Sequence, residues 1–149
     1  MEVRKARREE IELIANFQVL MAKETENLTL QKETVCKGVK ALFEHPERGE
    51  YIVALRDGEV VGCLLLLPEW SDWRCGTVLW IHSVYVVEQA RRQGVYTLLY
   101  ENVKERVENN PELKGIRLYV DESNKKAQST YEALGMNGDH YRLYEWLKG

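Results

Sequence analysis

The segment Arg91-Arg92-Gln93-Gly94 has the residue types of an anion-binding turn. It follows an apolar run, Ile81 to Val87, that predicts a strand, and it precedes a segment with helical spacing that begins near Val95. The start of a helix carries about half a positive charge and several backbone N–H groups that have no acceptor inside the helix. Gly94 lets the backbone approach an anion, and both arginines can add charge-assisted hydrogen bonds. The segment predicts a phosphate site, with a turn and a solvated basic surface as the alternative.

A second informative segment runs from Leu118 to Met136. A strand ending near Val120 leads to Asn124, which is followed by Ala127, Tyr131 and then Glu-Ala-Leu-Gly. Asn124 suits the N-cap of a helix. Tyr131 carries a phenol that can give up a proton, although a core aromatic is the alternative at this helical spacing.

In this order, the two segments resemble the cofactor-binding motifs of the GNAT acetyltransferases. Residues 91–96 are similar to that family's pyrophosphate loop, Gln/Arg-x-x-Gly-x-Gly/Ala, and residues 124–136 resemble its second motif. The resemblance implies acetyl-CoA as cosubstrate. The cofactor-binding residues that it implies are Val84, Tyr85, Val86, Arg91, Arg92, Gln93, Gly94, Val95, Tyr96, Thr97, Asn124, Ala127 and Tyr131.

One position departs from the family pattern, because Tyr96 stands where the loop has Gly or Ala. Two outcomes follow. Either the Tyr96 ring points away along the helix and Thr97 adds a hydroxyl in the first turn, or cofactor binding is weakened. Backbone N–H donors remain available in both cases.

The resemblance also implies catalytic roles. Tyr131 corresponds to the general acid that protonates the departing sulfur, but a phenol with a pKa of about 10 is roughly 1.5 units above a thiol, so hydrogen bonding can matter as much as transfer. His82, on the strand before the loop, is the first candidate for the general base, with a structural histidine as the alternative. The weaker candidates, acting through water, are Glu69, Asp72 and Asp121.

These assignments predict an N-acetyltransferase that moves an acetyl group from acetyl-CoA to a primary amine of a small molecule or peptide, by direct attack on the thioester. The alternative is a catalytically silent acyl-CoA-binding module with a regulatory or assembly role. Transfer of a longer acyl or an aminoacyl group is a third interpretation. Glu24 and Glu26 could attract a cationic acceptor, or simply form a solvated acidic turn.

The segments that must position these residues alternate between the apolar spacing of helices and that of strands. The patterns predict strands over residues 3–6, 51–55, 60–67, 77–87, 115–120 and 141–147. They predict helices over residues 8–23, 31–45, 96–107 and 124–134, and an Asp-Gly hairpin turn within 56–59. We expect an α/β (α+β) GNAT fold, a central mixed and mostly antiparallel sheet of six to seven strands flanked by about four helices.

Composition favours one domain over residues 1–149. The net charge of -3 and the scattered basic residues argue against nucleic acid as a partner. The longest apolar run, Val60 to Pro68, is too short to span a membrane, and the charged N-terminus favours a cytoplasmic location. We expect Cys36, Cys63 and Cys75 to be buried or half-buried structural thiols and no metal site, because these cysteines have no metal-ligand spacing. The apolar C-terminal strand favours a homodimer.

Overall fold

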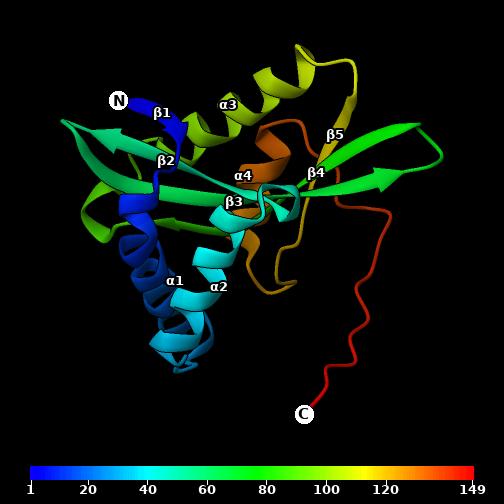
Figure 1. Cartoon of the computed structure of the whole chain (residues 1–149). Coiled ribbons are helices and arrows are strands. Elements are labelled where there is room, and N and C mark those ends of the chain that lie inside the picture. The colour runs from blue at the N-terminus through cyan, green and yellow to red at the C-terminus, as the bar shows by residue number, and fades with distance from the viewer. The chain divides into compact units, whose positions relative to one another are not determined.

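The computed structural model describes all residues from 1 to 149 (Figure 1). The chain divides by its internal contacts into two units, Met1–Leu118 and Tyr119–Gly149, and each is described by itself. No helix in either unit has both the length and the apolar character needed to cross a membrane.

The first unit is built on a five-stranded sheet in the order β1-β2-β3-β4-β5. Its strands are β1 (Glu2–Lys5), β2 (Glu50–Arg56), β3 (Glu59–Ser71), β4 (Gly76–Val86) and β5 (Leu113–Leu118). The first three pairings are antiparallel, and β4 and β5 are parallel. A parallel neighbour requires a crossover, which α3 (Val95–Glu108) supplies. The predicted mixed, mostly antiparallel sheet is confirmed.

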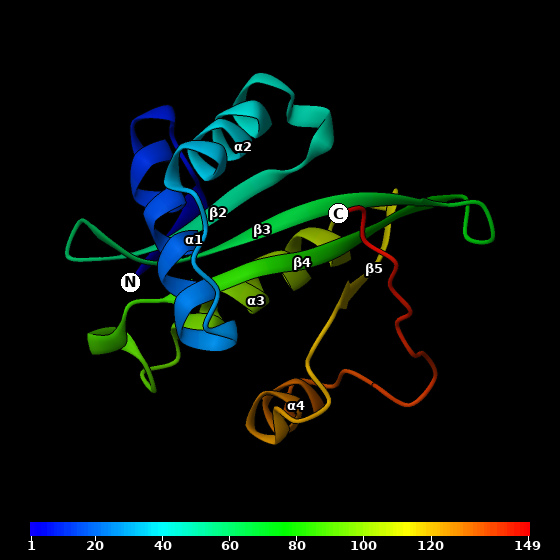
Figure 2. The same cartoon turned by 90° about the horizontal axis from the view of Figure 1, so that it is seen from below.

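Helices cover both faces of this sheet (Figure 2). On one face lie α1 (Ile11–Glu26) and α2 (Lys32–Glu44), and α3 lies on the other. In α1 the buried residues recur at helical spacing because only one face meets the sheet. The core on this side is formed by Ala6, Ile14, Ala15, Phe17, Val39, Tyr51, Val53, Leu55, Cys63, Leu65 and Tyr85.

Turn chemistry explains where several elements end. Asp57 and Gly58 have φ of 51° and 80°, as the tight hairpin predicted between β2 and β3 requires. Helix α1 ends at Asn27, whose left-handed φ of 51° is one that asparagine tolerates. Pro46 follows the end of α2, and a proline cannot continue a helix because it has no backbone N–H.

The second unit contains one helix, α4 (Lys125–Ala133). Its N-cap is Asn124, whose Oδ1 accepts a hydrogen bond of 3.1 Å from the backbone N–H of Ala127. The Gln128 amide closes the preceding turn by donating to the carbonyl oxygens of Asp121 and Glu122. After the helix, Gly135 has a φ of 90°. Helix capping therefore accounts for Asn124 and Gly135, and closure of the preceding turn accounts for Gln128.

Three sequence-based predictions were wrong. The sheet has five strands instead of six to seven, because residues 141–147 form no strand. Apolar residues in this segment favour a strand. A strand forms only where a neighbouring strand pairs with its backbone N–H and C=O groups, however, and none does so here. The strand predicted over residues 60–67 is longer than expected, since β3 pairs with β4 as far as Ser71. Cys75 is exposed, whereas Cys63 is buried and Cys36 is half-buried.

Candidate functional site

The start of α3 has the properties of an anion site. Gly94 is its N-cap, with a left-handed φ of 81°, and no side chain caps the helix there. The first turn contains no acidic residue. Thr97 is exposed, whereas Val95 is buried and can offer only its backbone. Uncapped N–H groups and the positive end of the helix dipole therefore coincide at the predicted position.

Hydrogen bonds to neighbouring elements hold the Arg91 side chain in the loop before α3. Arg91 donates from Nε to the carbonyl oxygen of Val86 at 2.8 Å and from Nη2 to Oε2 of Glu24 at 2.7 Å. Its guanidinium lies 5.5 Å from the centre of the Tyr85 ring. The Glu24 hydrogen bond raises the pKa of Arg91, so the group stays charged. Arg91 thus links the loop to α1 and β4.

The next two residues of the loop, Arg92 and Gln93, are placed differently from Arg91. Arg92 is exposed and takes a left-handed φ of 63°. Gln93 donates to the Gln89 carbonyl oxygen at 3.1 Å, and its Oε1 accepts from Arg56. The loop conformation is therefore fixed from both sides, and the exposed Arg92 side chain takes no part in these contacts.

The Tyr96 ring has the orientation expected in the first of the two predicted outcomes, and its effect on cofactor binding stays a prediction. Its ring centre lies 6.3 Å from that of Tyr100, one turn further along α3. The ring thus runs along the helix flank. This placement keeps the phenol beside the next turn of the helix.

The end of β4 departs from regular pairing at Ser83. Cys63 faces Tyr85 whereas Leu65 faces His82, so β4 has one more residue than β3 across this interval. Ser83 has a φ of 53°, which is unusual for a residue with a side chain. The parallel ladder with β5 ends at Ile81 and Leu118, but β4 continues to Val86. The backbone of Val84 to Val86 is therefore outside the β4–β5 ladder.

Gly62 is a positioning residue that the sequence reasoning missed. A Cβ at this position would lie 3.0 Å from Cγ1 of Val95 and 3.2 Å from the carbonyl oxygen of Tyr85. Any side chain at Gly62 would therefore press on the start of α3 and on the backbone at the end of β4. A glycine that interrupts the apolar run of β3 is the signal that could have indicated a close backbone approach.

His82 lies on the sheet face that α1 and α2 occupy, because it pairs with Leu65 of that core. Its ring centre is 6.2 Å from that of Trp80. Burial lowers the pKa of His82 below its ordinary 6.5, so the imidazole is neutral at pH 7. Beside it, Arg117 stacks on Trp80 and pairs with Glu69 at 3.1 Å. The neutral His82 imidazole therefore lies beside the Trp80 ring, next to the Arg117–Glu69 ion pair.

Tyr131 lies on α4, half-buried, and burial raises the pKa of its phenol above 10.0. Loss of its proton is therefore harder than in water. The predicted site residues thus fall into two groups: those from His82 to Thr97 belong to the first unit, and Asn124, Ala127 and Tyr131 belong to the second.

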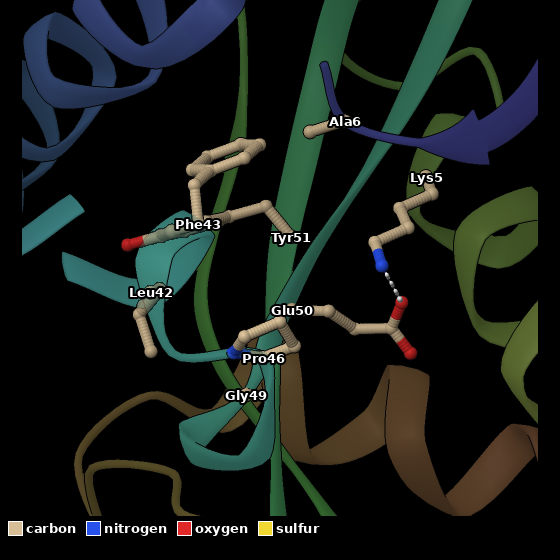
Figure 3. A pocket seen from close by; sticks show the side chains of 8 residues that line it. All are labelled: Lys5, Ala6, Leu42, Phe43, Pro46, Gly49, Glu50 and Tyr51. Carbon is tan, nitrogen blue, oxygen red and sulfur yellow. Dashed lines mark ion pairs between the residues drawn. The ribbon is translucent and has the colours of Figure 1, made fainter. Parts of the chain in front are cut away.

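A small cavity of about 60 Å³ lies among β1, the end of α2 and the start of β2 (Figure 3). Its charged groups, Lys5 and Glu50, pair with each other at 4.0 Å. Burial raises the pKa of Tyr51, which also lines it, to about 12. No predicted site residue lines this cavity.

Comparison with known proteins gives consistent results. The profile of the Acetyltransferase (GNAT) family matches residues 12–136. A possible acetyltransferase from Clostridium difficile 630 is 39% identical with a TM-score of 0.92, over 99% of this chain and 97% of that one. A ribosomal-protein-alanine N-acetyltransferase from Brucella melitensis biovar Abortus 2308 shares the fold, with 14% identity, a TM-score of 0.79 and 99% of both chains covered. A search of curated proteins gave no match.

The family match covers most of the chain and includes both segments singled out above, the loop before α3 and the helix α4. The fold agrees, since the mixed sheet with a parallel β4–β5 pair is shared with a relative that is 39% identical. The chain therefore belongs to the GNAT family of acetyltransferases.

Proposed function

We propose that this protein transfers an acetyl group from acetyl-CoA to a primary amine of a small molecule or peptide. The acyl donor supplies an activated carbonyl as a thioester, and the amine attacks that carbonyl directly. The observation that carries the proposal is the start of α3, where an uncapped helix without first-turn acids follows the left-handed Gly94. Such a helix start favours a diphosphate.

Residues of the first unit also offer partners for the pantetheine arm of acetyl-CoA. An extended arm with amide groups needs backbone partners, and β4 continues through Val84, Tyr85 and Val86 beyond its ladder with β5. The exposed Arg92 can neutralise phosphate charge. Backbone N–H groups from Gln93 to Thr97 would hold the diphosphate, and an N–H of β4 would polarise the thioester oxygen.

Two side chains are proposed for proton movement. His82 accepts the proton of the incoming amine, and its lowered pKa keeps it in the neutral form that this requires. As the C–N bond forms and the C–S bond breaks, Tyr131 donates a hydrogen bond to the sulfur, which leaves as the thiolate of coenzyme A and takes its proton from water. Because burial raises its pKa, the phenol remains protonated throughout neutral pH. Asn124 and Ala127 support Tyr131 indirectly, as the cap of α4.

Binding and turnover test this proposal separately. Calorimetry should show that the protein binds acetyl-CoA and binds acetyl-pantetheine, which has no diphosphate, at least about tenfold more weakly. Turnover on a panel of amines should be followed by mass spectrometry, because the exposed Cys75 would react with a thiol reagent. Binding without acetylation of any amine would favour the silent acyl-CoA-binding module instead. Absence of binding would refute the proposal.

We also infer that two copies associate through the C-terminal segment. Tyr144 and Trp146 are 84% and 87% exposed, and Leu143 and Leu147 are also exposed. An extended apolar segment of this kind favours pairing with another chain. Sedimentation equilibrium should give a dimer that Trp146→Ser weakens, and a monomeric wild type would contradict this inference.

A further inference from the structure

The ion pair between Glu24 and Arg91 joins residues that are 67 positions apart in the sequence. Glu24 lies near the end of α1, and Arg91 opens the loop before α3. The end of a helix carries partial negative charge, which adds to the attraction that the carboxylate exerts on the guanidinium. The Arg91 side chain is therefore directed toward the end of α1, although it stays partly exposed to solvent.

The contacts around this pair form one connected set. Phe17 and Glu24 are seven residues apart in α1, which places both on the same face of the helix. The Phe17 ring centre lies 5.1 Å from that of Tyr85, and the Arg91 guanidinium lies over the same Tyr85 ring. Helix α1 thus meets the end of β4 through an aromatic contact and meets the loop through an ion pair.

Fixing Arg91 restricts the residues that follow it. Its backbone N–H donates to the carbonyl oxygen of Glu88 at 3.2 Å, and its Nε binds the Val86 carbonyl oxygen. The chain then reverses through two left-handed residues, Arg92 and Gly94, and enters α3. The position of the uncapped N–H groups of α3 relative to β4 therefore depends on where the Arg91 side chain is held.

We propose that Glu24 is a positioning residue for acetyl-CoA binding, which acts through Arg91 and never touches the donor. The inference rests on the proposed function, since it concerns the same diphosphate site. By electrostatics alone, removing the negative charge of Glu24 near an anion site should strengthen the binding of acetyl-CoA. Loss of positioning should weaken it.

The experiment measures the Kd of acetyl-CoA by calorimetry for wild type, Glu24→Gln and Glu26→Gln. Glu26 is an exposed acid on the last turn of α1 and serves as the matched control for charge. Because the pair is half-exposed, Glu24→Gln should raise Kd by about three- to fivefold. Glu26→Gln should leave Kd unchanged or lower it slightly. Glu24→Asp, which keeps the charge, should recover part of the loss.

Two further readouts separate positioning from a general loss of structure. Glu24→Gln should raise the KM for acetyl-CoA with kcat unchanged, and it should not alter the Kd of acetyl-pantetheine, which lacks the diphosphate. In an Arg91→Gln background, Glu24→Gln should have no further effect, since the pair acts as a unit.

The results distinguish failure of the proposed function from failure of the role proposed for Glu24. If wild type does not bind acetyl-CoA, the proposed function and the role of Glu24 both fail. If wild type binds and Glu24→Gln binds equally or more tightly, only the role of Glu24 fails. The same holds if Glu26→Gln weakens binding as much, or if Glu24→Gln retains its full effect beside Arg91→Gln.

Discussion

The Sγ of Cys63 lies 4.0 Å from the carbonyl oxygen of Ser83, across the point where β4 carries its extra residue. Cys63 is fully buried, and the Gln18 amide approaches its sulfur at 3.9 Å. A buried thiol with these neighbours fixes one side of the bulge. Ser83 itself holds a φ of 53°, so the bulge is maintained by packing against the preference of the serine backbone.

This strain predicts opposite responses to glycine at neighbouring positions. Ser83→Gly should leave the free energy of unfolding unchanged or raise it, whereas Ser83→Val should lower it by about 1–2 kcal/mol because a β-branched residue disfavours positive φ. Val84→Gly, one residue further along β4, should be destabilising since no positive φ is required there. Urea unfolding measures all three. Stabilisation by Ser83→Val would mean that the bulge is not strained.

His82 should matter more for some acceptors than for others. A lysine-type amine with a pKa of about 10.4 is almost wholly protonated at pH 7, whereas an α-amine near pKa 8 needs little help. We expect His82→Ala to lower kcat/KM by about 10²-fold for the first and by less than about tenfold for the second. Steady-state kinetics with paired acceptors check this.

The pH profile gives a second test of His82. Since its pKa is lowered below 6.5, wild type should lose activity only below that pH, and His82→Ala should lack this acidic limb. His45→Ala is the control, because His45 is a half-exposed histidine of the first unit that lies outside the proposed site. Equal losses in the two variants, or equal losses for both acceptors, would rule out His82 as the base.

The uncapped start of α3, where we propose the diphosphate site, was predictable because local chemistry alone defines it. Gly94 is required at a left-handed N-cap, and the helix that follows was visible from its apolar spacing. The Asp57-Gly58 turn was predictable for the same reason. Each of these features depends on residues within a few positions of each other.

Features that depend on distant residues could not be predicted. Nothing in the sequence pairs Glu24 with Arg91, because helix α1 must first pack on β4 to bring them together. The bulge at Ser83 has no sequence signal, since serine is not a residue that favours positive φ. Residues 141–147 have a strand pattern, yet the first unit and its sheet form without them.

Tyr131→Phe should lower kcat by roughly 10- to 100-fold through loss of the hydrogen bond to the departing sulfur. The Kd of acetyl-CoA should change less than about twofold, because phenylalanine keeps the ring and its packing. Tyr144→Phe, at an exposed tyrosine of the same unit, is the matched control. Stopped-flow turnover and calorimetry separate the two effects. Unchanged kcat in Tyr131→Phe would show that another group assists the leaving thiolate.

Folding of the first unit should depend on pH through Glu10. Its carboxylate accepts hydrogen bonds from both Nη groups of Arg4, at 3.0 and 2.8 Å, and one of 2.8 Å from the backbone N–H of Arg7. The hydrogen bond with Arg4 is the main cause that lowers the pKa of Glu10 below its ordinary 4.5. Only 14% of this side chain is exposed, so solvent screens the pair weakly.

The direction of this pH dependence follows from proton linkage. Because the folded pKa is lower than the unfolded one, the unfolded chain binds the proton more readily, and the stabilisation is present above pH 4.5 and lost as pH falls through the folded pKa. Glu10→Gln should therefore destabilise by about 1–2 kcal/mol at pH 7 and by progressively less below pH 4.5. Urea unfolding across this range measures the difference, with the exposed Glu9→Gln as control. A deficit in Glu10→Gln that did not change with pH would mean that shape, and not the charged hydrogen bonds to Arg4, makes this residue stabilising.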